Sequence, residues 1–134
     1  MSNANIALAL ETALIAVSTG IQTAWENALF NVPPTAYQVV TIMFAEPENP
    51  TMGSPFFRQR GYLNVSIRYP LGVGKQPAVT RAEAMRTAFA RGTSFMANGI
   101  TTVIEKTPAI GTGSADETHF NVNFKAYFYA NIGA

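Results

Sequence analysis

The stretch Tyr62-Leu-Asn-Val-Ser-Ile-Arg-Tyr69 decides the fold class, because its apolar and polar side chains alternate without interruption. The apolar set is Leu63, Val65, Ile67 and Tyr69. A period of two is typical of a β-strand that buries one face and leaves the other in solvent. The strand ends at Pro70, which has no N–H to donate, and Gly72 and Gly74 permit positive φ in the turn that follows. The stretch therefore predicts a half-buried strand that leads into a tight turn.

Two helices are predicted from apolar residues that recur every three or four positions. The first spans Asn5 to Ser18, and Gly20 follows its end. The second begins at Pro77 and ends at Arg91-Gly92. The apolar stripes are Ile6, Leu10, Leu14 and Val17 in the first helix, and Ala78, Ala82, Met85 and Phe89 in the second. Each stripe predicts a helix that packs on a sheet through one face.

Four further strands are predicted, at Ile21 to Trp25, Tyr37 to Ala45, Ile100 to Glu105 and His119 to Tyr129. The last alternates most cleanly and places Phe120, Val122, Phe124 and Phe128 on one face, so it should be a core element. The strand that begins at Tyr37 has few polar residues on either face, which predicts a central strand covered on both sides. The order is α-β-β-β-α-β-β. It predicts an α+β fold, mainly antiparallel, with two helices packed on one face of the sheet.

Two loops separate these elements. Glu46 to Pro55 contains three prolines and a glycine and is the longest, and Ala109 to Ser114 is predicted to be a second flexible loop. An aromatic pair and two arginines follow the longer loop, and they are our candidate interface residues: Phe56, Phe57, Arg58 and Arg60. The aromatic pair has two interpretations, a small cluster tucked under the loop or a surface for a partner.

The composition indicates one domain and favours assembly. All 134 residues fit a single α+β domain, residues 1–134. Charged residues make up 13% of the chain, about half the usual share of about 25%, and a surface with so few charges is typical of protomers covered by neighbours. Nine basic and eight acidic side chains give a net charge of +1, so nucleic acid is not expected to be the main ligand.

The residue types that carry catalysis or bind metals are scarce. With no cysteine, disulfides and thiolate sites are excluded, and the single histidine, His119, is predicted to lie exposed at a strand end. Gly72-Val-Gly-Lys75 lacks the spacing of a phosphate-binding loop. The carboxylates Glu46, Glu48, Asp116 and Glu117 all fall in loops. We therefore predict no enzymatic activity, no metal and no cofactor.

The apolar segment Ile6 to Val17 is predicted to be a core helix and not a membrane or export signal. It is too short to span a bilayer, Glu11 lies at its centre, and no Lys or Arg precedes it. We therefore expect a protein that is made and stays in the cytoplasm, without membrane contact.

Several short strings resemble one family. They are Thr-Ala-Trp-Glu-Asn27, Pro33-Pro34, the stretch from Arg60 to Gly74, Phe89-Ala-Arg-Gly92 and Asn123-Phe-Lys-Ala-Tyr127. Together with the Ala- and Leu-rich first helix, they are similar to the small tail terminator and tail completion proteins of long-tailed, siphovirus-type double-stranded DNA bacteriophages. The resemblance covers nearly the whole chain and carries no catalytic motif.

The resemblance implies a virion structural protein at the neck end of the phage tail, assembled in the host cytoplasm. Such a protomer closes into a ring, commonly a hexamer, at the head-proximal end of the tail tube. There it stops tube polymerisation and offers the surface for head–tail joining. The implied partners are further copies of the chain, the tail tube protein and the head–tail connector, while DNA passes through the ring without specific binding. The candidate interface residues would contact a neighbouring subunit or the tube.

A competing interpretation is a small-molecule or peptide binding module with an α+β fold. In that case the loops Gly72 to Pro77 and Gly111 to Ser114 would form the rim of a pocket. The mass in solution distinguishes the two, because a binding module can be monomeric whereas a terminator forms a ring alone or with tube protein.

Overall fold

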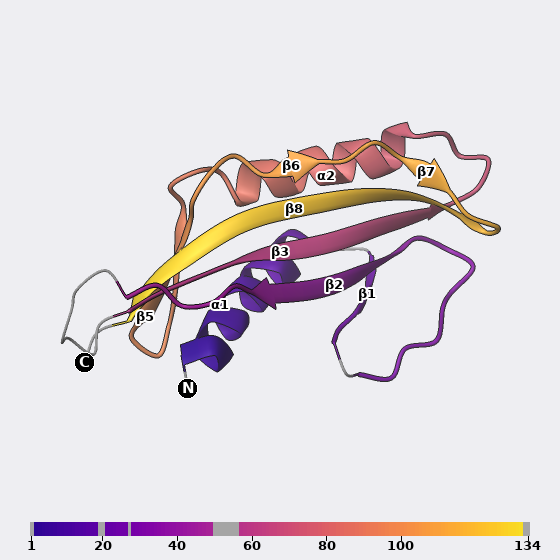
Figure 1. The fold of residues 1–134 in the computed structure, drawn as a ribbon. Helices are drawn as coiled ribbons and strands as arrows, with labels where there is room; N and C mark the ends of the chain where they lie inside the picture. The colour runs from indigo at the N-terminus through magenta and orange to yellow at the C-terminus, as the bar shows by residue number, and fades with distance from the viewer. Residues whose placement is uncertain (1, 19–20, 27, 50–56, 133–134) are drawn as a thin grey trace.

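A long antiparallel pair of strands forms the spine of the fold. In the computed structural model, which describes residues 2–18, 21–26, 28–49 and 57–132, β3 (Phe57–Pro70) pairs with β8 (His119–Ile132) over 14 residues each (Figure 1). The strand predicted at Tyr62 to Tyr69 is confirmed but begins five residues earlier. The alternation of apolar and polar residues does not predict this extension, because the polar residue Gln59 occupies a position on the buried face. Its amide donates to the backbone carbonyls of Ala45 and Arg60 at 2.7 and 3.0 Å.

The remaining strands extend the spine on both sides in the order β1-β2-β3-β8-β5-β4. They are β1 (Gln22–Ala24), β2 (Tyr37–Phe44), β4 (Ser94–Ala97), β5 (Ile100–Ile104), β6 (Ala109–Ile110) and β7 (Ser114–Ala115). The short strands β6 and β7 also pair with β8. Only the β1–β2 pair is parallel among the described pairs, so the predicted α+β class with a mainly antiparallel sheet is confirmed.

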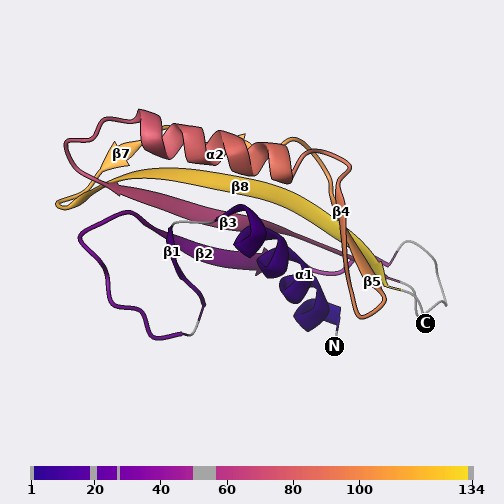
Figure 2. The same ribbon diagram turned by 180° about the vertical axis from the view of Figure 1, so that it is seen from behind.

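Both helices lie on the same face of the curved sheet, as the prediction required (Figure 2). Helix α1 (Ser2–Val17) contacts β4, β5 and α2, whereas α2 (Gln76–Ala88) contacts β8, β3 and β6. The core lies between the helices and the sheet, and it contains the predicted helix stripes together with Val122, Phe124 and Phe128 of β8. We call the opposite side, which neither helix covers, the outer sheet face. Neither helix in the described part of the chain is long and apolar enough to cross a bilayer.

Gly61 sits at the crossing point of two aromatic side chains. In the sheet register it lies between Phe44 of β2 and Phe128 of β8. The two rings meet edge-to-face above it, with centroids 5.9 Å apart. A Cβ atom at Gly61 would collide with the Met43 carbonyl oxygen and lie 2.8 Å from the Phe128 ring. The aromatic pair thus covers a position where only glycine fits.

One loop prediction was wrong, and one strand was missed. The segment Ala109 to Ser114 is not a free loop, because Ala109–Ile110 and Ser114–Ala115 pair with β8. The strand β4 was not predicted. It forms a hairpin with β5 around Asn98-Gly99, and both turn residues have positive φ.

Two burial predictions were also wrong. Strand β2 is not covered on both sides, because Met43 lies on the outer sheet face with 47% of its surface exposed. His119 is not exposed but buried. Its ring nitrogens lie 2.9 Å from the Thr118 hydroxyl and 3.1 Å from the Thr35 carbonyl oxygen, and its ring meets Tyr37 edge-on at 5.0 Å. The only histidine therefore ties β8 to the segment before β2.

Candidate functional site

The predicted interface residues do not form one surface. Phe56 lies outside the described residues, and strand alternation places Phe57 on the helix side of β3 while Arg58 and Arg60 lie on the outer sheet face. Arg60 pairs with Glu48 at 3.2 Å and with a second carboxylate, Glu105, at 3.6 Å. Among the predicted interface residues, Phe57 therefore lies on one side of the sheet, and Arg58 and Arg60 lie on the other.

The outer sheet face carries an array of cations lying over tyrosine rings. The pairs, with the distance from the cation to the ring centroid, are Arg58 over Tyr129 (5.1 Å), Arg68 over Tyr37 (5.6 Å), Lys106 over Tyr127 (4.2 Å) and Lys125 over Tyr62 (4.5 Å). Tyr62 and Tyr127 are direct cross-strand neighbours with centroids 5.7 Å apart. Hydrogen bonds fix the arginines further, since Arg58 donates to Asn131 at 2.8 Å and Arg68 to the Tyr37 hydroxyl at 3.0 Å.

The array concentrates positive charge on one face of the sheet, which the net charge of +1 does not reveal. Five of the nine basic side chains lie on the outer sheet face: Arg58, Arg60, Arg68, Lys106 and Lys125. Glu48 and Glu105 are the carboxylates paired with this set, both through Arg60. Asp116 also lies at this face, because its carboxylate accepts from Asn121, the cross-strand neighbour of Arg68, at 3.3 Å. The rest of the chain holds four basic and five acidic side chains. The net charge therefore does not describe this face, where cations outnumber carboxylates.

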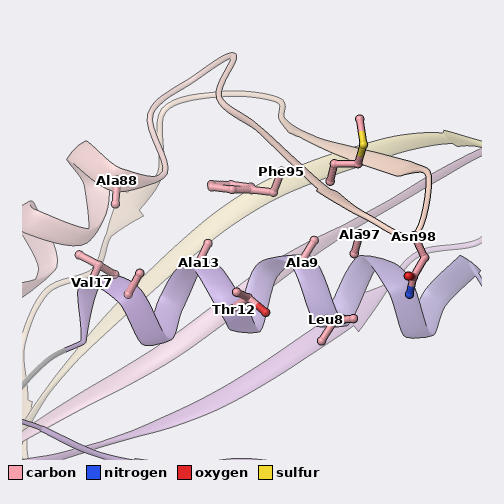
Figure 3. Close-up of a pocket in the computed structure, with 11 residues that line it drawn as sticks. Leu8, Ala9, Thr12, Ala13, Val17, Ala88, Phe95, Ala97 and Asn98 are labelled. Atoms are coloured by element: carbon pink, nitrogen blue, oxygen red, sulfur yellow. The ribbon is translucent and has the colours of Figure 1, made fainter.

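A second surface is an apolar groove between α1 and the β4 hairpin, with a volume of about 790 Å³ (Figure 3). Its lining residues are Leu8, Ala9, Thr12, Ala13, Ala16, Val17, Ala88, Phe95, Met96, Ala97 and Asn98. The small alanines of α1 let the helix approach β4, and Asn98 donates to the Asn5 side chain at 2.8 Å near one end. Leu8 and Met96 are 49% and 71% exposed. The groove is a feature that the sequence analysis missed, because α1 was read only as a core helix.

The neighbourhood of α1 is poor in charge. Glu11 is the only charged residue of the helix, and partial burial followed by the nearby Glu26 carboxylate raises the pKa of Glu11. Ile15 on the same helix is 60% exposed. Outward apolar side chains thus continue along α1 beyond the groove itself.

The single histidine and the Asp116 carboxylate, both candidates for chemistry, are engaged in structure. No group of three or more His, Asp or Glu side chains among them could hold a metal ion. Asp116 accepts hydrogen bonds from the backbone N–H groups of His119 and Thr118 at 2.7 and 2.8 Å, and these bonds lower its pKa to about 2. The carboxylate therefore stabilises the turn between β7 and β8.

The pocket predicted for a binding module is only partly present. A depression of about 440 Å³ beside the start of α2 is lined by Tyr69, Gln76, Pro77, Thr80, Arg81 and Ala84. Of the predicted rim it includes the end of the first loop, Gln76 and Pro77, and none of the residues 111–114. Gly111 instead donates its N–H to the Asn123 carbonyl oxygen at 2.7 Å, which holds it against β8.

The fold and the two surfaces define a two-layer α+β protein with one sheet face that no helix covers and an apolar flank. A family model described as phage tail terminator protein matches residues 5–125. The chain therefore belongs to the phage tail terminator family, and the resemblance seen in the sequence is confirmed.

Comparison with solved structures shows that the fold recurs elsewhere. One matching chain, titled only with a sequence identifier, superposes with a TM-score of 0.83 at 19% identity, and the match covers 100% of this chain and 99% of that one. At this identity the match shows the shared fold alone. No curated protein sequence matches the chain.

Proposed function

We propose that this phage tail protein closes into a ring, commonly a hexamer in proteins of this kind, at the head-proximal end of the tail tube. In this position it stops tube polymerisation and presents the surface for joining the head connector, and DNA passes through the ring. The family membership supports a structural role in the tail, and we propose no catalytic activity and no cofactor for it. The virion neck is the proposed location, after assembly in the host cytoplasm.

The observation that carries this proposal is the apolar flank formed by α1 and β4. A contiguous apolar surface on a protein with few charges marks an interaction site. Leu8, Ile15 and Met96 expose about half or more of their surface on this flank. A neighbouring subunit seated in the groove would remove these side chains from water.

The sheet edges support a head-to-tail contact. Strand β4 ends the sheet on one side, and on the other side β1 covers only residues Tyr37–Val39 of β2. Beyond that point Glu26 accepts the Ile42 N–H at 2.8 Å, which protects part of the edge. Two different surfaces at opposite ends of one sheet are suited to a heterologous contact, and such contacts close into rings when the rotation permits.

The predicted contact at Phe57 remains part of the proposal. Phe57 is half-buried at the start of β3, next to the segment that contains Phe56. We assign these aromatics to the contact with the tube or a neighbouring subunit. Arg58 and Arg60 lie on the other face and are treated below.

The experiment compares Met96→Asp with Val73→Asp. Met96 lies in the groove, whereas Val73, which is 50% exposed, lies in the turn before α2 and outside the groove. A carboxylate at Met96 would be buried without a partner at the interface, so we expect loss of ring formation and tube capping with an unchanged circular dichroism spectrum. Light scattering with and without tube protein, and tube lengths in electron micrographs, measure both effects. Normal capping by Met96→Asp, or equal loss in Val73→Asp, would place the contact elsewhere.

A binding module is the second candidate, supported by the depression beside α2. A protein that stays monomeric with tube protein and does not limit tube length would favour it.

A further inference from the structure

We propose that the outer sheet face is a non-specific contact surface for the phosphate backbone of duplex DNA. The inference deepens the proposed function and rests on it, because DNA must pass a ring placed at the neck of the tail. It assigns a partner to the side of the sheet that the helices leave uncovered.

The charge of this face matches a polyanion. Five cations stand against three carboxylates. Glu48 and Glu105 both contact Arg60, and Asp116 accepts a hydrogen bond at 3.3 Å from Asn121, the cross-strand neighbour of Arg68. The remaining cations, Arg58, Arg68, Lys106 and Lys125, each lie over a tyrosine ring. A ring attracts a cation through its quadrupole and does not consume the N–H donors of an ammonium group. The ammonium groups of Lys106 and Lys125 therefore keep their donors for phosphate oxygens. The guanidinium groups of Arg58 and Arg68 donate in part to Asn131, Ser66 and Tyr37 and keep their remaining N–H groups for phosphate.

The length of the array also fits a duplex. Arg58 and Arg68 lie ten residues apart on the same face of β3, a distance of about 33 Å at the rise of a β-strand. One turn of B-form DNA measures about 34 Å. Lys125 is paired with the middle of this stretch, opposite Asn64. The cations thus follow a row about as long as one helical turn, on a face that no helix covers. At the Arg68 end the segment before β2 lies over this face and buries Tyr37 and His119.

Such a face provides affinity without sequence recognition. Contacts to phosphates carry no sequence information. Binding of this kind lets a protein slide along DNA, and it weakens as salt rises because counterions are released. A surface of this type would guide DNA through the ring and release it.

The test compares two variants of the full chain with the same change in net charge. The face variant carries Arg58→Gln, Arg68→Gln and Lys125→Gln, and the control carries Lys75→Gln, Arg86→Gln and Arg91→Gln, all exposed and outside the array. Fluorescence anisotropy with a labelled 30-base-pair duplex of mixed sequence gives the Kd between 50 and 200 mM NaCl. Melting curves establish that both variants are folded. If the face variant does not fold, Lys106→Gln with Lys125→Gln replaces it, because these substitutions leave the arginine hydrogen bonds intact.

We expect the face variant to bind at least ten-fold more weakly than the wild-type at 50 mM NaCl, and the control within about two-fold. The slope of log K against log salt should fall by about 0.9 for each phosphate contact removed, about 2.7 for three. Equal weakening in both variants, or no measurable binding by the wild-type, would overturn the inference. A face variant that binds DNA normally but fails to join heads would show that the face docks a protein.

The DNA-binding result can be distinguished from the test of the proposed terminator function. Tube capping is measured on the same variants, and the face variant should still limit tube length because the α1 groove is intact. Loss of DNA binding with normal capping supports both proposals. Normal DNA binding by the wild-type without capping leaves the surface assignment in place and refutes the terminator role.

Discussion

Replacing Gly61 with alanine inserts one methyl group into the closest-packed point of the sheet. The new Cβ would collide with the backbone carbonyl oxygen of Met43 and lie 2.8 Å from the Phe128 ring. Overpacking of this kind destabilises a protein by about 1–3 kcal/mol, and the upper end applies because a carbonyl within the β2–β3 ladder cannot swing aside. The reduced freedom of the unfolded chain offsets about 0.5–1 kcal/mol. We expect a net loss of about 2 kcal/mol in the free energy of unfolding.

Urea denaturation followed by the fluorescence of Trp25, the single tryptophan, measures this loss. A loss of about 2 kcal/mol corresponds to a melting temperature about 8 °C lower for a chain of this size. The matched control is Gly111→Ala, where the nearest atom would lie 3.5 Å away and a change within about 0.5 kcal/mol is expected. Gly113→Ala should fall between the two, because it meets only the Phe120 side chain, which can rotate. A Gly61→Ala variant as stable as the control would refute the packing argument.

The other predictions concern the core, the edge and one turn. Phe124→Ala should lower the free energy of unfolding by about 3–5 kcal/mol in denaturant melts, because Phe124 is fully buried between the sheet and the helices, and a loss below about 1 kcal/mol would contradict this. Glu26→Ala removes the acceptor of the Ile42 N–H and should cost about 1 kcal/mol, with faster hydrogen exchange at Ile42 and unchanged exchange in β8. The pKa of Asp116 is lowered from 3.8 to about 2 in the folded state, so its stabilisation is present above about pH 4 and is lost as the pH falls through 2. Urea midpoints at pH 5 and pH 2.5 should therefore differ less in Asp116→Asn than in the wild-type, and equal differences would exclude the role of the turn.

The fold was predictable where a strand or helix is long enough to show its period. The alternation around Leu63 and along β8 indicates buried faces directly, and the helix stripes identify the faces that pack on them. Strands of two residues such as Ala109–Ile110 show no period, and they form only because β8 offers them a long partner. His119 was misjudged for a related reason, since its contacts with Thr35 and Tyr37 join segments more than 80 residues apart.

The candidate surfaces depend on pairings that a linear pattern does not contain. Arg58 and Arg60 were predicted from their place beside a loop, and the strand pairing places them on the outer sheet face. Lys125 joins them only because β8 pairs with β3 in one register. The sequence does hold an indication of this face. In each of the two predicted strands, cations and tyrosines occupy alternate positions and so lie on the same side of the strand. Only the pairing of β3 with β8 shows that these two sides form one surface.

The same cations also fix the register of the sheet. All Arg and Lys side chains of β3 and β8 lie on the outer sheet face. Leu63, Val65 and Ile67, which lie on the opposite face of β3, are fully buried. A slip by one residue would move every side chain of a strand to the opposite face. In β8 it would bring the Lys125 ammonium beneath α2 without a partner, and burial of an unpaired charge costs several kcal/mol or forces its neutralisation. The β3–β8 pairing is therefore specified twice, by apolar residues that must enter the core and by charges that must stay out of it. Neutral outer faces would leave only the first constraint, so a variant without these charges should retain its fold while losing part of its protection against mispairing.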